Sequence, residues 1–133
     1  MKRKHSIVIV DDDADDREII RDAFEATIEG QEYIFIENGD RLLDYLSEQS
    51  DASIPSLIML DLNMPGKDGR ETLKEIKTDS RFQHIPTIVF TTSSSQRDKQ
   101  IVYDLGANCF ITKPDTFKKL IDLATSINKL WLQ

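Results

Sequence analysis

The sequence predicts an α/β fold in which a doubly wound, five-stranded parallel sheet is covered by helices on both faces. Short apolar runs alternate with longer amphipathic stretches along the chain, and this alternation is typical of parallel strands joined by helical crossovers. The runs are apolar throughout rather than at every second residue, as strands buried on both faces require. Acidic, hydroxyl or basic residues follow most of these runs. We expect the strand order 2-1-3-4-5, because it places the strands with such endings side by side.

Each expected strand is a short apolar run that stops at a polar residue or a turn signal. The expected strands span residues 6–10, 33–36, 57–61, 87–90 and 108–112. Each expected helix carries apolar residues at helical spacing after a cap or turn residue. The expected helices begin near Asp15, Asp40, Lys67, Ser95 and Thr116, with Asp40 acting as the cap of its own helix.

The composition is that of one globular domain. The chain has 133 residues, of which 39% are apolar and 31% are charged, and we expect residues 1–133 to form a single domain. No apolar run approaches the roughly 18 residues that a membrane span needs, so we expect a cytoplasmic protein without membrane insertion. The net charge of −7 argues against direct contact with nucleic acid, because such contact relies on Lys and Arg neutralising phosphates.

An acidic stretch follows the first expected strand. Asp13, Asp15 and Asp16 precede or open the first helix, where negative charge is stabilising through capping and the helix dipole. We therefore assign these three residues a structural role. Asp11 and Asp12 directly follow the strand and are candidates for chemistry.

Four of the expected strands end on side chains that can bind or react. Asp11 and Asp12 follow the first strand, Asp61 the third, Thr91 the fourth and Lys113 the fifth. In open parallel sheets, ligands bind outside the carboxyl ends of the strands, where the strand order reverses. The predicted order makes these four strands neighbours, so three acids, one hydroxyl and one lysine are expected to converge.

The three carboxylates need a cation. Like charges about 4 Å apart repel by roughly 4 kcal/mol at an effective dielectric constant of 20, and Lys113 offsets only part of this repulsion. Oxygen ligands without His or Cys favour Mg²⁺, which in proteins takes one or two carboxylates and often a phosphate. A carboxylate in such a site can accept a phosphoryl group. The sequence therefore predicts an aspartyl-phosphate site with Mg²⁺ as its cofactor.

Four motifs carry a resemblance to a known family over essentially the whole chain. They are VDD at residues 10–12, LDLNMPGKDG at 60–69, IP with FTT at 85–92, and GANCFITKP at 106–114. The chain resembles the response-regulator receiver domains of two-component signalling, which have a CheY-like, flavodoxin-like fold. The resemblance implies that Asp61 is the phosphoacceptor and that Asp61, Asp11, Asp12 and the backbone carbonyl of Asn63 bind Mg²⁺. It also implies that Lys113 pairs with the phosphate. Thr91 would be the switch hydroxyl and Phe110 the aromatic switch residue.

The resemblance adds roles around the phosphoacceptor. Asn63 and Ser93 occupy positions that tune dephosphorylation in this family. Pro65 and the glycines after it are expected to shape a loop that keeps the aspartate open to its phosphoryl donor. Phe110 also fits a plain core residue, and this alternative stays open.

The resemblance also implies partners. A receiver takes its phosphoryl group from a phosphohistidine on a sensor histidine kinase or a phosphotransfer protein. Because no effector domain follows Gln133, we expect output through contact with a downstream protein. The chain is similar to stand-alone receivers, including those that serve phytochrome kinases.

Both a monomer and a weak homodimer, formed through the fourth helix, fifth strand and fifth helix, remain compatible with the sequence. The expected catalysis is limited to loading and hydrolysing its own aspartate, so we expect a switch and not a turnover enzyme.

An alternative function is an Asp-nucleophile phosphatase of the haloacid-dehalogenase type. The first strand followed by Asp11, Asp12 and Asp13 resembles the motif of that class. The motif requires Thr or Val where this chain has Asp15. A chain of 133 residues also lacks room for a cap domain or a full substrate pocket.

Overall fold

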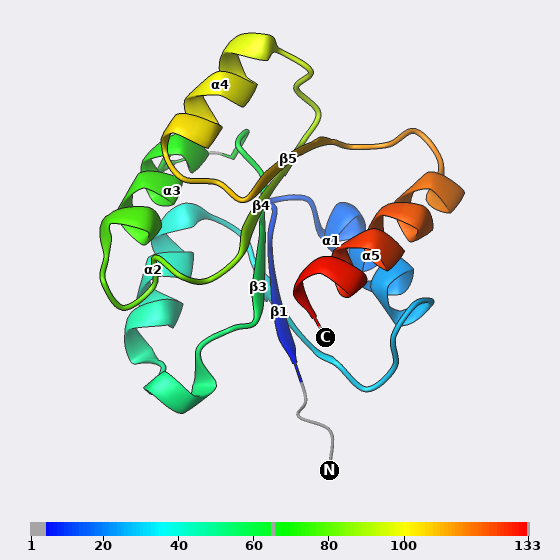
Figure 1. Ribbon diagram of the computed structural model, residues 1–133, viewed down its shortest axis with the longest axis horizontal. Helices are drawn as coiled ribbons and strands as arrows, with labels where there is room; N and C mark the ends of the chain where they lie inside the picture. The colour runs from blue at the N-terminus through cyan, green and yellow to red at the C-terminus, as the bar shows by residue number, and fades with distance from the viewer. Residues whose placement is uncertain (1–4, 65, 133) are drawn as a thin grey trace.

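Five parallel strands form one sheet in the order β2-β1-β3-β4-β5, as predicted from the sequence (Figure 1). The computed structural model describes residues 5–64 and 66–132. All four strand pairings are parallel, so every strand has its carboxyl end at the same edge of the sheet. The strands are β1 (Ser6–Val10), β2 (Glu32–Ile36), β3 (Leu57–Leu60), β4 (Thr87–Thr91) and β5 (Cys109–Thr112).

Helices cover both faces of the sheet. In Figure 1, α1 and α5 lie on one side of the strands, and α2, α3 and α4 lie on the other. This arrangement is the doubly wound fold that the sequence predicts. The helices are α1 (Ala14–Glu25), α2 (Gly39–Glu48), α3 (Gly69–Thr78), α4 (Gln96–Asp104) and α5 (Phe117–Trp131), with a short 3-10 turn η1 (Asp51–Ser53) before β3.

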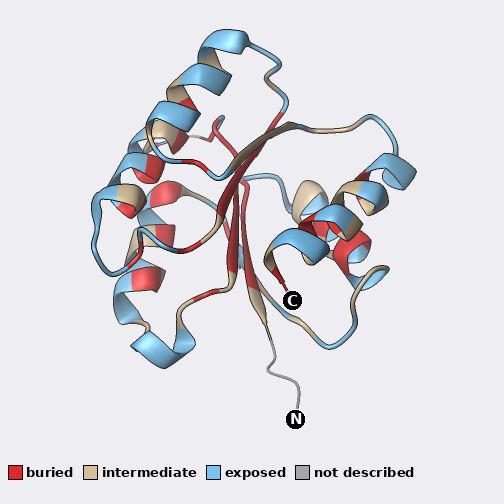
Figure 2. Ribbon diagram, in the orientation of Figure 1, coloured by how far each residue is buried: buried red, intermediate tan, exposed pale blue. Residues whose placement is uncertain are grey.

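The hydrophobic core has two layers, one on each face of the sheet. Successive side chains of a strand point to opposite faces. Ile7 and Ile9 of β1 pack with residues of α1 and α5, whereas Val8 and Val10 pack with residues of α2 and α3. Figure 2 shows the central strands as the most continuously buried part of the chain. Because both faces are buried, these strands are apolar throughout.

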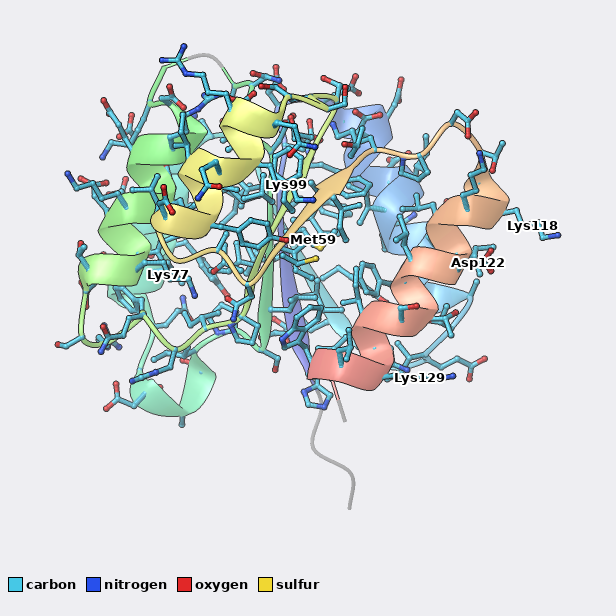
Figure 3. All side chains as sticks on the ribbon, turned by 45° about the horizontal axis from the view of Figure 1, so that its top comes forward. Met59, Lys77, Lys99, Lys118, Asp122 and Lys129 are labelled. Atoms are coloured by element: carbon cyan, nitrogen blue, oxygen red, sulfur yellow. The ribbon has the colours of Figure 1, made fainter. Side chains whose placement is uncertain are left out.

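Helix α5 shows the amphipathic pattern most clearly. Its inner face buries Leu120, Ala124 and Ile127. Lys118 and Asp122 lie on its outer face and point away from the sheet (Figure 3), and both are exposed. The apolar stripe therefore fixes which face of α5 packs on the strands.

The predicted cap of α2 is wrong. Asn38, and not Asp40, precedes the helix, and its side-chain oxygen accepts a hydrogen bond from the Arg41 N–H at 2.9 Å. Gly39 begins the helix and is packed so closely against Thr72 of α3 that a Cβ would clash with that side chain. Asp40 instead lies in the first turn, where its charge complements the helix dipole.

Other helix starts follow the predicted caps closely. Asp13, Ser95 and Thr116 cap α1, α4 and α5 with side-chain hydrogen bonds to backbone N–H groups. Helix α3 begins at Gly69 behind the cap Asp68, slightly later than predicted. Among residues 5–64 and 66–132, no helix combines the length and the apolar character needed to cross a bilayer.

Candidate functional site

Three carboxylates converge at the carboxyl ends of β1 and β3. One carboxylate oxygen from each of Asp11, Asp12 and Asp61 lies within 4.8 Å of the others. The backbone holds two of these residues in place, because the Asp61 N–H donates to Val10 at 3.0 Å and the Asp11 N–H donates to Ile36 at 3.0 Å. Asp11 is 2% exposed and Asp61 is 6% exposed, whereas Asp12 is open to solvent. The predicted acidic cluster therefore forms, with two buried members and one exposed member.

Lys113 reaches this cluster from the end of β5. Its Nζ lies 2.8 Å from Asp11 Oδ2 and 3.4 Å from Asp61 Oδ2. Its backbone N–H donates to the Thr91 carbonyl at 2.7 Å, which extends the pairing of β4 and β5 by one residue. The lysine is thus fixed at its backbone and aimed across β4 toward the carboxylates of β1 and β3.

Asp16 is a third partner of Lys113, which the sequence analysis missed. The Asp16 backbone does join the predicted cap, since its N–H donates to Asp13 Oδ1 at 3.3 Å. Its carboxylate, however, lies 3.0 Å from Lys113 Nζ. The two residues are 97 positions apart in the chain, and only the packing of α1 beside the end of β5 brings them together. Asp16 therefore lies at the start of the helix as predicted, and its carboxylate also contacts the lysine of the site.

Burial and charge oppose each other at this cluster. Burial raises the pKa of Asp11, and the hydrogen bonds from Lys113 and from the Asp13 N–H only partly counteract it. Burial alone would lower the pKa of Lys113, but hydrogen bonds to Asp11 and Asp16 and attraction to Asp61 outweigh it and raise that pKa. The lysine therefore stays charged, while Asp11 holds its negative charge at a cost.

The donor set fits a divalent cation. The carboxylates outnumber the single ammonium group, so the cluster keeps a net negative charge. Among the described residues, nothing donates a hydrogen bond to the Asp12 carboxylate, which leaves its oxygens free to bind. The Asn63 N–H donates to Asp61 Oδ1 at 3.2 Å, which holds Asn63 beside the cluster. Carboxylate and carbonyl oxygens are the ligands that hard divalent cations prefer.

Thr91 and Phe110 lie on the neighbouring strands. Thr91 is fully buried at the end of β4, and its Oγ1 accepts hydrogen bonds from Asn63 Nδ2 at 3.3 Å and from the Ser93 N–H at 3.4 Å. Phe110 of β5 is partly buried against the core layer of α2 and α3. Its N–H donates to the Tyr103 hydroxyl of α4 at 3.0 Å. Phe110 therefore contacts the core and the α4 side of the molecule at once.

The segment after Asp61 is shaped by glycine. A Cβ on Gly69 would lie 2.7 Å from the Asp61 carbonyl oxygen and 2.7 Å from the Leu62 Cα, so only glycine lets α3 start this close to the strand end. Gly66 has a φ of 85°, a left-handed conformation that favours glycine. Pro65 lies outside the described residues.

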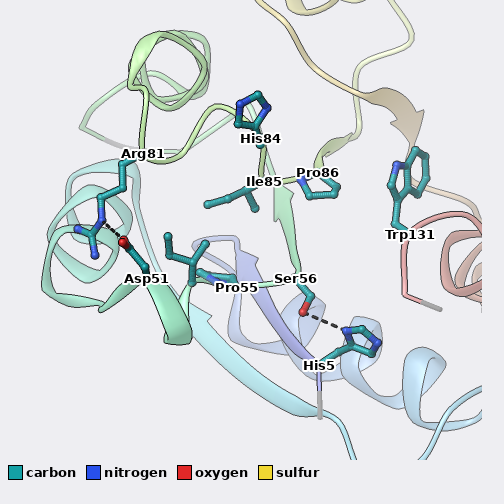
Figure 4. Close-up of a pocket in the computed structure, with 10 residues that line it drawn as sticks. His5, Asp51, Pro55, Ser56, Arg81, His84, Ile85, Pro86 and Trp131 are labelled. Carbon is teal, nitrogen blue, oxygen red and sulfur yellow. Dashed lines mark hydrogen bonds and ion pairs between the residues drawn. The ribbon is translucent and has the colours of Figure 1, made fainter. Parts of the chain in front are cut away.

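The opposite end of the sheet carries a hollow with different chemistry. This space of about 470 Å³ lies beside the amino ends of β1, β3 and β4, and Figure 4 shows His5 hydrogen-bonded to Ser56 and Arg81 paired with Asp51. Its only lining carboxylate, Asp51, is thus already paired. None of the predicted site residues lines it. The candidate site is therefore at the carboxyl ends of the strands.

Comparison with known proteins identifies the family. The sequence model described as "Response regulator receiver domain" matches residues 7–125. The chain belongs to this family. The response regulator Rcp1 from Synechocystis sp. is 34% identical over 130 residues, which cover 96% of this chain and 88% of that protein. The receiver-domain match therefore agrees with the strand order and the acidic cluster, and it gives the phosphatase alternative no support.

Solved receiver structures agree in fold. The phosphorylated cyanobacterial phytochrome response regulator RcpA has a TM-score of 0.89 to this receiver domain at 36% identity, with 98% of this chain and 96% of that chain covered. The Mn²⁺-bound form of Rcp1 has a TM-score of 0.85 at 33% identity, with 97% and 95% covered. An acidic cluster that suits a divalent metal is thus consistent with the family to which this receiver belongs.

Proposed function

We propose that the chain is a single-domain response regulator, spanning residues 1–133 as one receiver, that accepts a phosphoryl group on Asp61 from a phosphohistidine. The observation that carries this proposal is the position of Lys113, whose Nζ lies between Asp61 and Asp11 beside the three-carboxylate cluster. An aspartate that only forms a turn after a strand does not require a partly buried lysine and two further carboxylates beside it. A carboxylate nucleophile flanked by a fixed cation and by metal-binding oxygens suits phosphoryl transfer.

In the proposed reaction, a carboxylate oxygen of Asp61 attacks phosphorus and forms the new P–O bond. The phosphohistidine carries a proton on the ring nitrogen that is not bonded to phosphorus. Its P–N bond breaks, and the ring takes that electron pair and leaves as a neutral imidazole. Lys113 pairs with the negative oxygens of the transferred group, because its Nζ already lies 3.4 Å from Asp61 Oδ2. Asp11 and Asp16 hold the ammonium group in place and charged.

We assign the metal to Mg²⁺, held by Asp11, Asp12, Asp61 and the backbone carbonyl of Asn63. When bound, the ion supplies positive charge to the oxygens of the transferring phosphoryl group. The oxygen-only donor set and the exposed position of Asp12 support this assignment. The Mn²⁺-bound form of Rcp1 supports a divalent metal in a related protein.

The response would pass from Thr91 to Phe110. The Thr91 hydroxyl now accepts hydrogen bonds from its neighbours and is proposed to turn and donate to a phosphoryl oxygen on Asp61. Phe110 would follow, since β4 and β5 are paired directly at this end of the sheet. The altered face of α4, β5 and α5 would then contact a downstream protein or a second copy of the chain.

The proposed setting is a cytoplasmic phosphorelay. The donor is a sensor histidine kinase or a phosphotransfer protein, and the protein acts as a switch without turnover of an external substrate. The similarity to RcpA, a cyanobacterial phytochrome response regulator, supports a donor kinase of the phytochrome type.

Intact mass measurement tests the proposal. The protein is mixed with Mg²⁺ and acetyl phosphate, and an added mass of about 80 Da, one phosphoryl unit, is expected. Asp61→Asn should abolish the adduct. Asp68→Asn is a matched control, because Asp68 lies in the same segment and Asn preserves its role as the cap of α3. Steady hydrolysis of a small phosphoester that depends on Asp11 would contradict the proposal and favour a phosphatase.

A further inference from the structure

Ser93 is the centre of a hydrogen-bond network in the connection between β4 and α4. Its N–H donates to Thr91 Oγ1 at 3.4 Å, and its hydroxyl donates to Asp98 Oδ2 at 2.7 Å. The same hydroxyl accepts from the Ser95 N–H at 3.1 Å, and its carbonyl accepts from Thr112 Oγ1 at 2.8 Å. A movement of Thr91 therefore cannot leave Ser93 unaffected.

Asp98 joins this connection to two helices. It lies in the first turn of α4, where its N–H donates to Ser95 Oγ at 3.2 Å. Its Oδ1 accepts from Arg70 Nη2, and Arg70 also pairs with Asp68 at 3.1 Å. Arg70 belongs to α3, so the chain Arg70, Asp98 and Ser93 ties the β4–α4 connection to the starts of α3 and α4.

The Arg70–Asp98 pair is better shielded than most ion pairs of the described chain. The two side chains are 28% and 20% exposed, compared with 64% and 77% for the pair of Lys119 and Asp115. The hydrogen bond from Arg70 keeps the pKa of Asp98 below its usual range. Asp98 therefore remains a charged acceptor for Ser93 at neutral pH.

The network occupies the hydroxyl oxygen of Thr91. Its hydroxyl oxygen accepts from Asn63 and Ser93, and within the described residues no hydrogen bond joins it to Asp61. If the hydroxyl turned toward a phosphoryl group while the connection stayed fixed, the Ser93 N–H would lose its partner, and an unpaired amide at a partly buried position costs free energy. The connection must therefore move with Thr91, and the Asp98 contact opposes that movement.

We propose that Arg70, Asp98 and Ser93 form a latch that restrains the β4–α4 connection and keeps Thr91 turned away from Asp61 until phosphorylation. These three are positioning residues, because they act through Thr91. The proposal deepens the proposed function and rests on it. A contact present in only one of two conformations favours that conformation by its own free energy. For a shielded ion pair and one coupled hydrogen bond, we expect a penalty on activation of about two- to fivefold.

Two measurements test the latch. One is the affinity for beryllofluoride in the presence of Mg²⁺, measured by calorimetry, and the other is the rate at which acetyl phosphate phosphorylates the protein. Asp98→Asn removes the ion pair with Arg70 but keeps a polar group beside Ser93. Ser93→Ala keeps the ion pair but uncouples it from Thr91. Arg81→Gln is the control, because it removes the Arg81–Asp51 pair at the other end of the sheet.

Both latch variants should bind beryllofluoride and load phosphate about two- to fivefold more readily than the wild type, and Arg81→Gln should not differ from it. The double variant Asp98→Asn/Ser93→Ala should gain no more than the better single variant, because both changes open the same latch. The latch is overturned if the single variants bind beryllofluoride no better than the wild type, or if their gains add in the double variant. Phosphorylation of the wild type would still support the proposed function in that case. If wild type takes up neither beryllofluoride nor phosphate, the proposed function fails and the latch fails with it.

Discussion

The two halves of the site differ in how their side chains are held. In the charged half, the single Nζ of Lys113 contacts carboxylates of Asp11, Asp16 and Asp61 at 2.8–3.4 Å, and these groups are mostly buried. In the hydroxyl half, Thr91 is held by neutral hydrogen bonds of 3.3 and 3.4 Å. Charge-assisted bonds are shorter and stronger than neutral ones. The half that receives the phosphoryl group is thus fixed, and the half that reports its arrival is held by contacts that can be exchanged.

This difference has a consequence for stability. Removing Lys113 would leave two buried carboxylates without their cation, whereas Lys113 without Asp11 would still keep Asp16 and Asp61 as partners. Exchanging a neutral hydrogen bond costs little. Substitutions in the charged half should therefore change the free energy of unfolding strongly. Substitutions in the hydroxyl half should change it weakly and act mainly on the switch.

The largest expected effect is that of Lys113→Met. Without Mg²⁺, it should lower the free energy of unfolding by about 3 kcal/mol at pH 7, because Asp11 and Asp61 lose their shared cation. The loss should shrink in acid, because burial raises the pKa of Asp11 and that carboxyl then takes up a proton. Urea unfolding with EDTA measures this effect. Lys118→Met, on the exposed face of α5, should change the free energy by less than about 0.5 kcal/mol, and equal stability of the two variants would contradict a fixed charged half.

A smaller effect of opposite sign is expected for Asp11→Asn. Burial raises the pKa of Asp11 in the folded protein, so the native state favours the protonated carboxyl. That contribution is fully present below the unfolded pKa near 3.9 and is lost as the pH rises through the folded pKa. Without metal at pH 7, the variant should be about 0.5–2 kcal/mol more stable than wild type, and the gain should vanish at pH 3. A gain that persists at pH 3 would refute this cause.

The same variant should lose its response to metal. At a Mg²⁺ concentration ten times the dissociation constant, wild type should gain about 1.4 kcal/mol of stability. Asp11→Asn should gain much less, because one of the three carboxylates of the cluster is gone. Repeating the unfolding series with and without EDTA measures the difference, and an equal Mg²⁺ response in both proteins would remove Asp11 from the metal site.

The smallest expected effect is that of Asp98→Asn on stability. The hydrogen bond from Arg70, and then that from Ser93, lowers the pKa of Asp98 in the folded protein. This contribution is present above the unfolded pKa near 3.9 and is lost as the pH falls through the folded pKa. The variant should lose about 0.2–1 kcal/mol at pH 7 and nothing at low pH. Thermal unfolding across pH 3–7 measures the change in stability of each variant relative to the wild type. This change should have opposite signs for Asp11→Asn and Asp98→Asn at pH 7, and equal signs would contradict the difference between the two halves.

The fold and the convergence of the strand ends could be predicted from the sequence. Strands buried on both faces are apolar throughout, and helical crossovers between parallel strands have one hand. Asp11, Asp61 and Lys113 each follow such a run directly, so their placement depends only on where a strand ends. The sequence pattern determines that point well.

Contacts made by helices could not be predicted in this way. Asp16 meets Lys113 across 97 positions, and Arg70 meets Asp98 across 28, because both contacts depend on how helices pack beside strand ends. The cap of α2 was predicted wrongly for a related reason. Asn38 and a nearby Asp are both good cap residues, and the close packing of Gly39 against α3 decides between them.

Backbone amide shifts measured by NMR test the contrast between the halves most directly. Addition of Mg²⁺ alone should shift the amides of Asp13 and Asn63, which donate to Asp11 and Asp61, and leave those of Ser93, Asp98 and Phe110 in place. Addition of beryllofluoride should then shift Ser93, Asp98 and Phe110 as Thr91 exchanges its partners. If the amides of Ser93 and Asp98 stay unchanged in the beryllofluoride complex, the hydroxyl half does not respond and the account is contradicted.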